Sequence, residues 1–69
     1  MKRLKDVLKE QGRTQVWLAE QLSKQGIDRD KGTMSLYCTG ERKPRDLYVS
    51  YVIADILGVK REVIVNCFK

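Results

Sequence analysis

With 69 residues, the chain has room for a single domain, which we expect to cover residues 1–69. Hydrophobic residues make up 42% of it and charged residues 33%, a balance that excludes a disordered tail and favours a compact soluble fold. The 14 lysines and arginines exceed the 9 acidic residues and give a formal net charge of +5. This surplus favours a polyanionic partner, nucleic acid or an anionic membrane, although such a charge also serves solubility alone.

Cysteine and histidine usage argues against a metal site or a disulfide framework. Cys38 and Cys67 are far apart, and the chain has no histidine, so we expect two reduced, partly buried thiols and no cofactor. The start MKRLKDVLKE lacks the apolar core of a signal peptide, and the most apolar region, residues 49–59, is too short to span a membrane. We therefore expect a cytoplasmic protein without a membrane partner.

The first predicted helix covers residues 2–11 and ends at Gly12. Its inward face carries residues at helical spacing: Leu4, Val7, Leu8 and Gln11. A second helix begins after Thr14, a good N-cap, and ends at Gly26. Its predicted core residues are Leu18, Ala19 and Leu22. Trp17 is expected to cover the following turn or to contact a partner subunit.

A third helix is predicted at about residues 30–38. Asp28 and Asp30 are both N-cap candidates, and we favour Asp30; Ile27 should enter the core before it. Two residues three apart, Met34 and Tyr37, should pack against the second helix, and Gly40 should end the third helix. The outward positions are then Lys31, Gly32, Ser35 and Leu36. If the helix were rotated, Leu36 would instead be a core residue.

The rest of the chain predicts two more helices and an all-α bundle of about five. Asp46 is a cap candidate for the fourth helix, which ends at Gly58 before the core residue Val59. Its expected inward residues are Leu47, Ser50 or Tyr51, Ala54 and Leu57. A short fifth helix covers residues 61–67. An apolar tail that looks too large for so small a core predicts a homodimer contact at Val63, Ile64, Val65 and Phe68.

The segments TQVWLAEQL, TMSLYCTGERKP and IADILGV, in this order, resemble the Cro/lambda-repressor family of helix-turn-helix proteins, also called the xenobiotic-response-element type. The resemblance covers nearly the whole chain. It implies a compact five-helix bundle in which helices two and three form the helix-turn-helix and the third helix lies in the major groove of double-stranded DNA. It also implies a small transcriptional regulator of the phage or mobile-element repressor type that binds its operator as a dimer.

The resemblance also assigns roles to single residues. Gln15 matches a glutamine that bonds a phosphate and steadies the recognition helix. Lys31 and Gly32 match the first exposed residues of that helix, and Ser35 and Leu36 match the next pair. The basic residues after the helix match phosphate contacts. The complete expected DNA-binding set is Thr14, Gln15, Arg29, Lys31, Gly32, Thr33, Ser35, Leu36, Thr39, Arg42, Lys43 and Arg45.

One segment departs from the family pattern. Between Ala19 and Met34 the chain is several residues longer than is common in the family, which leaves open where the recognition helix starts. Lys31 is preferred over Arg29 as the residue that contacts bases. Gly32, unfavourable inside a helix, either lets the backbone approach DNA closely or marks a loop that precedes the helix. The loop is the preferred interpretation.

Two other classes of function remain as alternatives. The longer turn, with its mixed charges, is also compatible with a protein-interaction module, such as an antitoxin or an inhibitor of a DNA-binding enzyme. Binding of single strands or RNA is disfavoured because the chain has few aromatic residues to stack on bases. The sequence DRDKG after Ile27 lacks the glycine and glutamate of a calcium loop, and no phosphate loop or Ser/His or Cys/His pair occurs, so an enzyme with a small-molecule substrate is not expected.

Overall fold

The computed structural model describes residues 2–68, which contain five α-helices and no strand. The helices are α1 (Leu4–Glu10), α2 (Gln15–Lys24), α3 (Lys31–Thr39), α4 (Leu47–Leu57) and α5 (Arg61–Cys67). Short connections join them into a body of 27 × 26 × 21 Å. The predicted all-α bundle of five short helices is confirmed.

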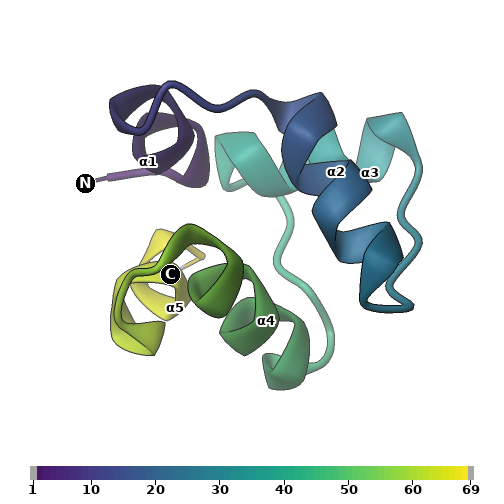
Figure 1. Cartoon of the computed structure of the whole chain (residues 1–69). Helices are drawn as coiled ribbons and strands as arrows, with labels where there is room; N and C mark the ends of the chain where they lie inside the picture. The colour runs from purple at the N-terminus through teal and green to yellow at the C-terminus, as the bar shows by residue number, and fades with distance from the viewer. Residues whose placement is uncertain (1, 69) are drawn as a thin grey trace.

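The helices form two groups (Figure 1). In this view α1, α2 and α3 lie above, and α4 and α5 form a close pair below. Within the upper group α3 packs against both α1 and α2, and α2 also packs against α4 across the boundary. The segment that links α3 to α4 descends from one group to the other and connects them.

The core draws on all five helices. Several side chains have no exposed surface: Leu4, Leu18, Leu22, Met34, Ile53 and Ile64. Ile27 and Tyr37 are buried as predicted, and Ala19 and Val59 are half-buried against the same core. The helical spacing of apolar residues therefore identified most of the interior correctly.

Predictions for α4 were less accurate. Leu47 was expected inward, but 51% of it is exposed, because it begins α4 at the edge of the bundle and only lines a hollow beside Phe68. Ser50, not Tyr51, is the buried member of that pair. Tyr51 is half-buried beneath the Arg61 guanidinium, whose carbon lies 4.7 Å from the centre of the ring.

Helix caps explain where the elements begin. The Thr14 hydroxyl accepts a hydrogen bond from the Trp17 amide (3.1 Å), and the Asp30 carboxylate accepts one from the Thr33 amide (2.9 Å). These bonds satisfy amides that the helices themselves leave unpaired. The preference for Asp30 over Asp28 is thus confirmed. Asp46 also occupies an N-cap position, at α4, but its side chain makes no cap bond.

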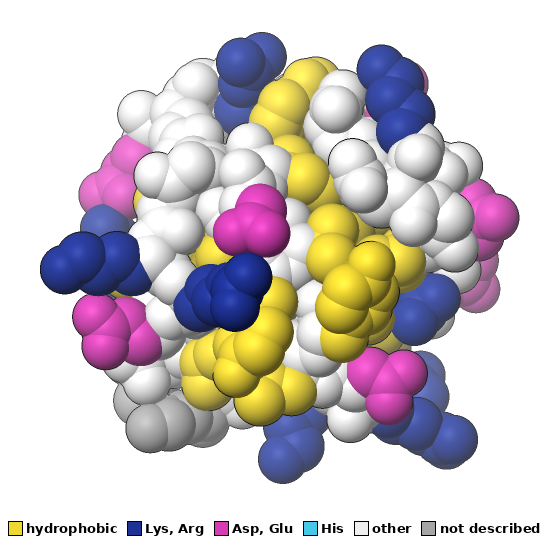
Figure 2. Space-filling model, turned by 60° about the horizontal axis from the view of Figure 1, so that its bottom comes forward, with side chains coloured by type: hydrophobic (Ala, Val, Ile, Leu, Met, Phe, Trp, Pro, Cys, Tyr) yellow, Lys and Arg dark blue, Asp and Glu magenta, His cyan; other side chains and the backbone are white. Residues whose placement is uncertain are grey.

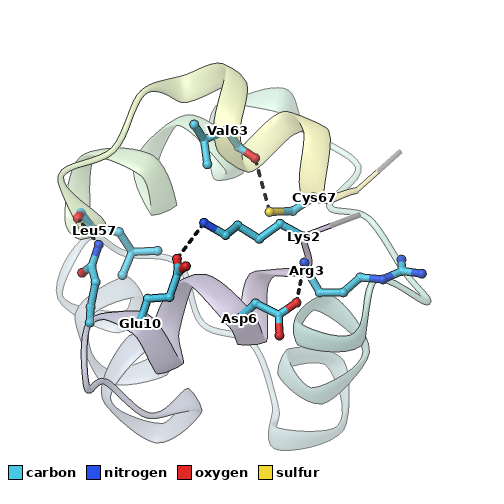
Figure 3. A network of polar contacts seen from close by, with 8 residues as sticks. Lys2, Arg3, Asp6, Glu10, Leu57, Val63 and Cys67 are labelled. Atoms are coloured by element: carbon cyan, nitrogen blue, oxygen red, sulfur yellow. Dashed lines mark hydrogen bonds and ion pairs between the residues drawn. The ribbon is translucent and has the colours of Figure 1, made fainter.

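Polar contacts tie α1 to α4 and surround the N-terminal segment (Figure 3). The side-chain amide of Gln11 donates to the Leu57 carbonyl oxygen (2.8 Å), and Lys2 pairs with Glu10 (2.7 Å). The hydrogen bond and charge of Glu10 raise the pKa of Lys2. Gln11 was expected on the inward face of the first helix, but it is exposed and lies just beyond the end of α1, where only its side-chain amide reaches α4.

Both cysteines are buried free thiols, as predicted. Burial raises the pKa of Cys38, and burial, assisted by the Asp6 carboxylate, raises the pKa of Cys67. Among residues 2–68, no helix has the length and apolar character needed to cross a membrane. The same residues contain no cluster of three or more side chains suited to hold a metal ion.

Candidate nucleic-acid interface

The start of α3 is fixed by the Asp30 cap. Lys31 is the first residue of the helix, and Gly32 is the second. The preferred interpretation of Gly32 as part of a loop is therefore wrong: the Asp30 cap draws the chain into a helix before it. A side chain built at Gly32 would meet no atom within 4 Å, so the outer surface of the helix is open there.

The outward side of α3 is short and only weakly polar. Lys31, Gly32 and Ser35 are exposed, whereas Met34, Tyr37 and Cys38 form the buried side. The remaining positions, Thr33, Leu36 and Thr39, are half-buried. Leu36 is thus neither a core residue nor a fully exposed one. The Thr39 hydroxyl donates to the Leu36 carbonyl oxygen (3.2 Å) within the same helix.

The first residue of α2 is bonded to the first residue of α3. The side-chain amide of Gln15 donates to the Lys31 carbonyl oxygen at 3.2 Å. This contact bridges the connection (residues 25–30) and fixes the start of α3 relative to α2. Because an amide nitrogen carries two hydrogens, Gln15 keeps a second donor. The hydroxyl of Thr14, in contrast, already serves as the cap of α2.

Four cations gather on the other side of α3. Arg42, Lys43 and Arg45 belong to the basic loop (residues 40–46), and all three are exposed. Arg29 reaches them from the connection: its Nη1 donates to the Asp28 carbonyl oxygen (2.9 Å) and its Nε to the Tyr37 hydroxyl (3.4 Å). The sequence separates Arg29 from the loop, and the fold brings them together around one hollow.

Two of the acidic residues near α3 accept hydrogen bonds, whereas a third, Asp46, borders the same hollow as the four cations. The Ser23 hydroxyl donates to Asp28 (2.8 Å), and the hydrogen bonds from Thr33 lower the pKa of Asp30. The two ion pairs among residues 2–68 are Lys2–Glu10 and Arg61–Asp55, and neither involves a cation of the basic loop or the connection. The positive charge beside α3 is therefore not neutralised by ion pairs of the described residues.

The predicted dimer contact needs a correction. Ile64 has no exposed surface, because α5 packs closely on α4, so it is not available to a second subunit. Val63, Val65 and Phe68 are half-buried. The Phe68 ring meets Tyr37 edge to face, with centroids 6.0 Å apart. The premise that the whole apolar tail exceeds the capacity of the core is wrong.

A second apolar surface escaped the sequence analysis. Trp17, which was expected to cover the connection or to contact a partner subunit, lines a hollow between α2 and α4 with Tyr48, Val52 and Ile56, and the Arg13 guanidinium lies 4.4 Å from its ring centre. Figure 2 shows hydrophobic side chains gathered on the face that carries α4 and α5, with isolated charges among them. The spacing of Tyr48, Val52 and Ile56, four residues apart on α4, was the available signal.

Comparisons with known proteins leave the function to be argued from this geometry. No protein-family model, characterised protein or solved structure matches the chain.

Proposed function

We propose that the protein binds double-stranded DNA sequence-specifically, as a small transcriptional regulator, through α2 and α3 acting as a helix-turn-helix. In this proposal the outward side of α3 enters the major groove. Lys31 and Ser35 reach base edges, and Leu36 rests on a thymine methyl group. The role is one of binding in the cytoplasm, without catalysis or a cofactor.

The position of the cations is the observation that carries the proposal. The exposed side of α3 is bordered by the start of α2 at Gln15, which is bonded to Lys31, and by cations of the connection and the basic loop that form no ion pair among residues 2–68. DNA-binding proteins draw most of their affinity from phosphate contacts and their sequence preference from a few base contacts. In the proposed complex, the exposed positions of α3 contact bases, and the groups on either side of the helix contact phosphates, so the arrangement supplies both sequence preference and affinity.

A salt titration of duplex binding tests the proposal. Binding of the protein to a labelled random duplex should weaken linearly, on logarithmic scales, as salt rises, because each phosphate contact releases counterions. Selection from a random pool should then return a recurring sequence. No measurable affinity for duplex at low salt would reject the proposal.

We further propose that the protein acts as a homodimer on DNA. Leu47, Val65 and Phe68 border a hollow that also includes Lys43 and Arg45 of the basic loop. A second copy seated there would cover the exposed part of Leu47. Two subunits joined beside their basic loops would present two copies of α3 to one duplex, as paired half-sites require.

A protein-interaction module is the second candidate. The hollow between α2 and α4 has a volume of about 490 Å³ and is bordered by Trp17 and Tyr48, and 61% of Tyr48 is exposed. Aromatic side chains of this kind are enriched in protein interfaces. If the duplex titration gives no binding, this surface becomes the favoured site, as expected of an antitoxin or inhibitor.

A further inference from the structure

A hollow of about 250 Å³ between α3 and the basic loop brings Tyr37 and Arg29 together with cations already expected to contact phosphates. We call it the basic hollow. Four cationic side chains, two hydroxyl-bearing side chains and one carboxylate border it: Arg29, Arg42, Lys43, Arg45, Thr33, Tyr37 and Asp46. An excess of donors and positive charge around one small space suits a phosphate group.

Arg29 is held at the basic hollow from two sides. Its Nη1 is fixed to the Asp28 carbonyl oxygen at 2.9 Å, and its Nε lies 3.4 Å from the Tyr37 hydroxyl oxygen. A guanidinium has five N–H donors, so donors remain after these two bonds. These two contacts orient the exposed side chain before it meets an anion, which reduces the conformational entropy lost on binding.

Tyr37 supplies a second fixed donor. Only 4% of it is exposed, and its ring is wedged edge to face against Phe68. The hydroxyl accepts the hydrogen bond from Arg29, and a phenol can accept and donate at the same time. Its hydrogen is therefore available as a donor, and Tyr37 borders the basic hollow.

The basic hollow lies on the flank of α3 that faces away from α2. Thr33 and Tyr37, one helical turn apart, border it, whereas Lys31 and Met34 border the groove between α3 and α2; Arg29, on the connection, borders both. A duplex whose major groove held α3 would place one strand near the start of α2. The other strand would then run along the flank that carries the basic hollow.

We propose that the basic hollow seats one backbone phosphate of the strand remote from α2, bound by the Arg29 guanidinium and the Tyr37 hydroxyl together with the cations of the basic loop. The inference rests on the proposed DNA binding and assigns a role to the connection. Arg29 then contacts phosphate rather than bases, and the lengthened turn becomes a phosphate clamp.

Two substitutions test the clamp in duplex binding. Arg29→Gln should weaken binding at low salt and lower the salt slope by about one unit, so that its affinity falls about three- to fourfold less than that of the wild type between 50 and 200 mM salt. Lys60→Gln, which removes one charge at the start of α5, is the matched control and should leave the slope unchanged. Tyr37→Phe alone should weaken duplex binding. Added to Arg29→Gln, it should cause no further loss, because both groups hold the same phosphate.

A titration with inorganic phosphate, followed by NMR, separates this inference from the proposed function. The Arg29 Nε–H signal of the wild-type protein should shift, and Tyr37→Phe should reduce the apparent affinity. Duplex binding with an unchanged slope in Arg29→Gln would overturn the clamp and leave DNA binding intact. Absence of duplex binding with a phosphate-dependent shift at Arg29 would overturn DNA binding and retain an anion site. Absence of both effects would reject both proposals.

Discussion

Gly40 ends α3 and lies against the N-terminal segment. Its φ of +81° is in the left-handed region that favours glycine. The Arg3 guanidinium packs where a Cβ on Gly40 would stand, next to the C-terminal end of α3. A cation in this position is favourable because the last carbonyl groups of a helix carry partial negative charge. Gly40 thus determines both how the chain leaves α3 for the basic loop and where the Arg3 side chain packs.

Gly40→Ala should destabilise the protein for two reasons. The left-handed conformation costs about 1–2 kcal/mol for a residue with a Cβ, and the new methyl group displaces Arg3. Gly12→Ala is the matched control, since Gly12 has a φ of +67° but no neighbour within 4 Å of its Cβ position. Chemical denaturation should show a larger loss for Gly40→Ala. Equal losses, or no recovery on adding Arg3→Ala, would contradict the steric part.

The Asp30 cap should make the folded protein lose stability at acid pH, where the carboxylate becomes protonated. Its hydrogen bonds from Thr33 lower the pKa of Asp30 in the folded state, so its contribution is fully present above the pKa of the unfolded chain, about 3.9. The contribution is lost as pH falls through the lowered value. Asp30→Asn keeps a capping side chain that does not titrate, so its melting temperature should fall less steeply on acidification. Asp46→Asn is the control, because Asp46 occupies an N-cap position but its side chain makes no cap bond. If the melting temperatures of the wild type and Asp30→Asn fell equally as pH is lowered, this role of the Asp30 carboxylate would be contradicted.

At the scale of the element, the residues of α3 serve three purposes. Met34 and Tyr37 anchor it in the core, its first carbonyl is bonded to Gln15, and its outward positions are small or half-buried. Few long polar side chains therefore project from the helix itself. Lys31 is the one long exposed side chain of α3. If the protein binds DNA as proposed, Lys31 contributes to sequence preference, and the basic loop contributes affinity for any DNA sequence.

Lys31→Ala and Lys43→Ala should therefore have different effects. Loss of Lys31 should reduce discrimination between the selected duplex and its variants by about 1–3 kcal/mol at one base pair. Loss of Lys43 should weaken binding to all duplexes and lower the salt slope by about one unit. Binding measured to selected and random duplexes at several salt concentrations distinguishes them. Equal losses on both duplexes from both substitutions would reject this division of roles.

The whole molecule has faces of different character. The unneutralised cations lie beside α3, whereas hydrophobic side chains with isolated charges occupy the face of α4 and α5 (Figure 2). Leu47 stands near the meeting point of these two regions, since its hollow also includes Lys43 and Arg45. In the proposed dimer, a contact centred on Leu47 and Phe68 joins the apolar surface of one chain to that of the other, leaves both copies of α3 uncovered and keeps the charged ends of Lys43 and Arg45 at its rim, free for phosphate.

Leu47→Ser should weaken the proposed dimer without unfolding the chain, because 51% of Leu47 is exposed in the single subunit. Val16→Ser is the matched control: Val16 is 60% exposed but borders the groove between α2 and α3. Sedimentation of the free protein and of its complex with duplex would measure the effect. A wild-type protein that sediments as a monomer in both conditions would show that the dimer proposal is wrong.

The sequence by itself determined the helices, most of the core and the caps at Thr14 and Asp30. These features depend on local spacing and on side chains that bond amides a few residues away, so they can be read from neighbouring positions. The same local rules failed at Leu47 and Ile64. The burial of Leu47, at the start of α4, and of Ile64, in the middle of α5, depends on what the neighbouring helices cover, and spacing along one helix contains no such information.

Only the tertiary structure decided which distant residues meet. Gln15 reaches the Lys31 carbonyl, Arg29 reaches the Tyr37 hydroxyl, and the Arg3 guanidinium reaches Gly40 because packing fixes the angles between helices. Those angles result from the fit of many side chains at once. The sequence could therefore nominate the basic residues, whereas the hollow that gathers four of them arises from the packing of α3 and the basic loop.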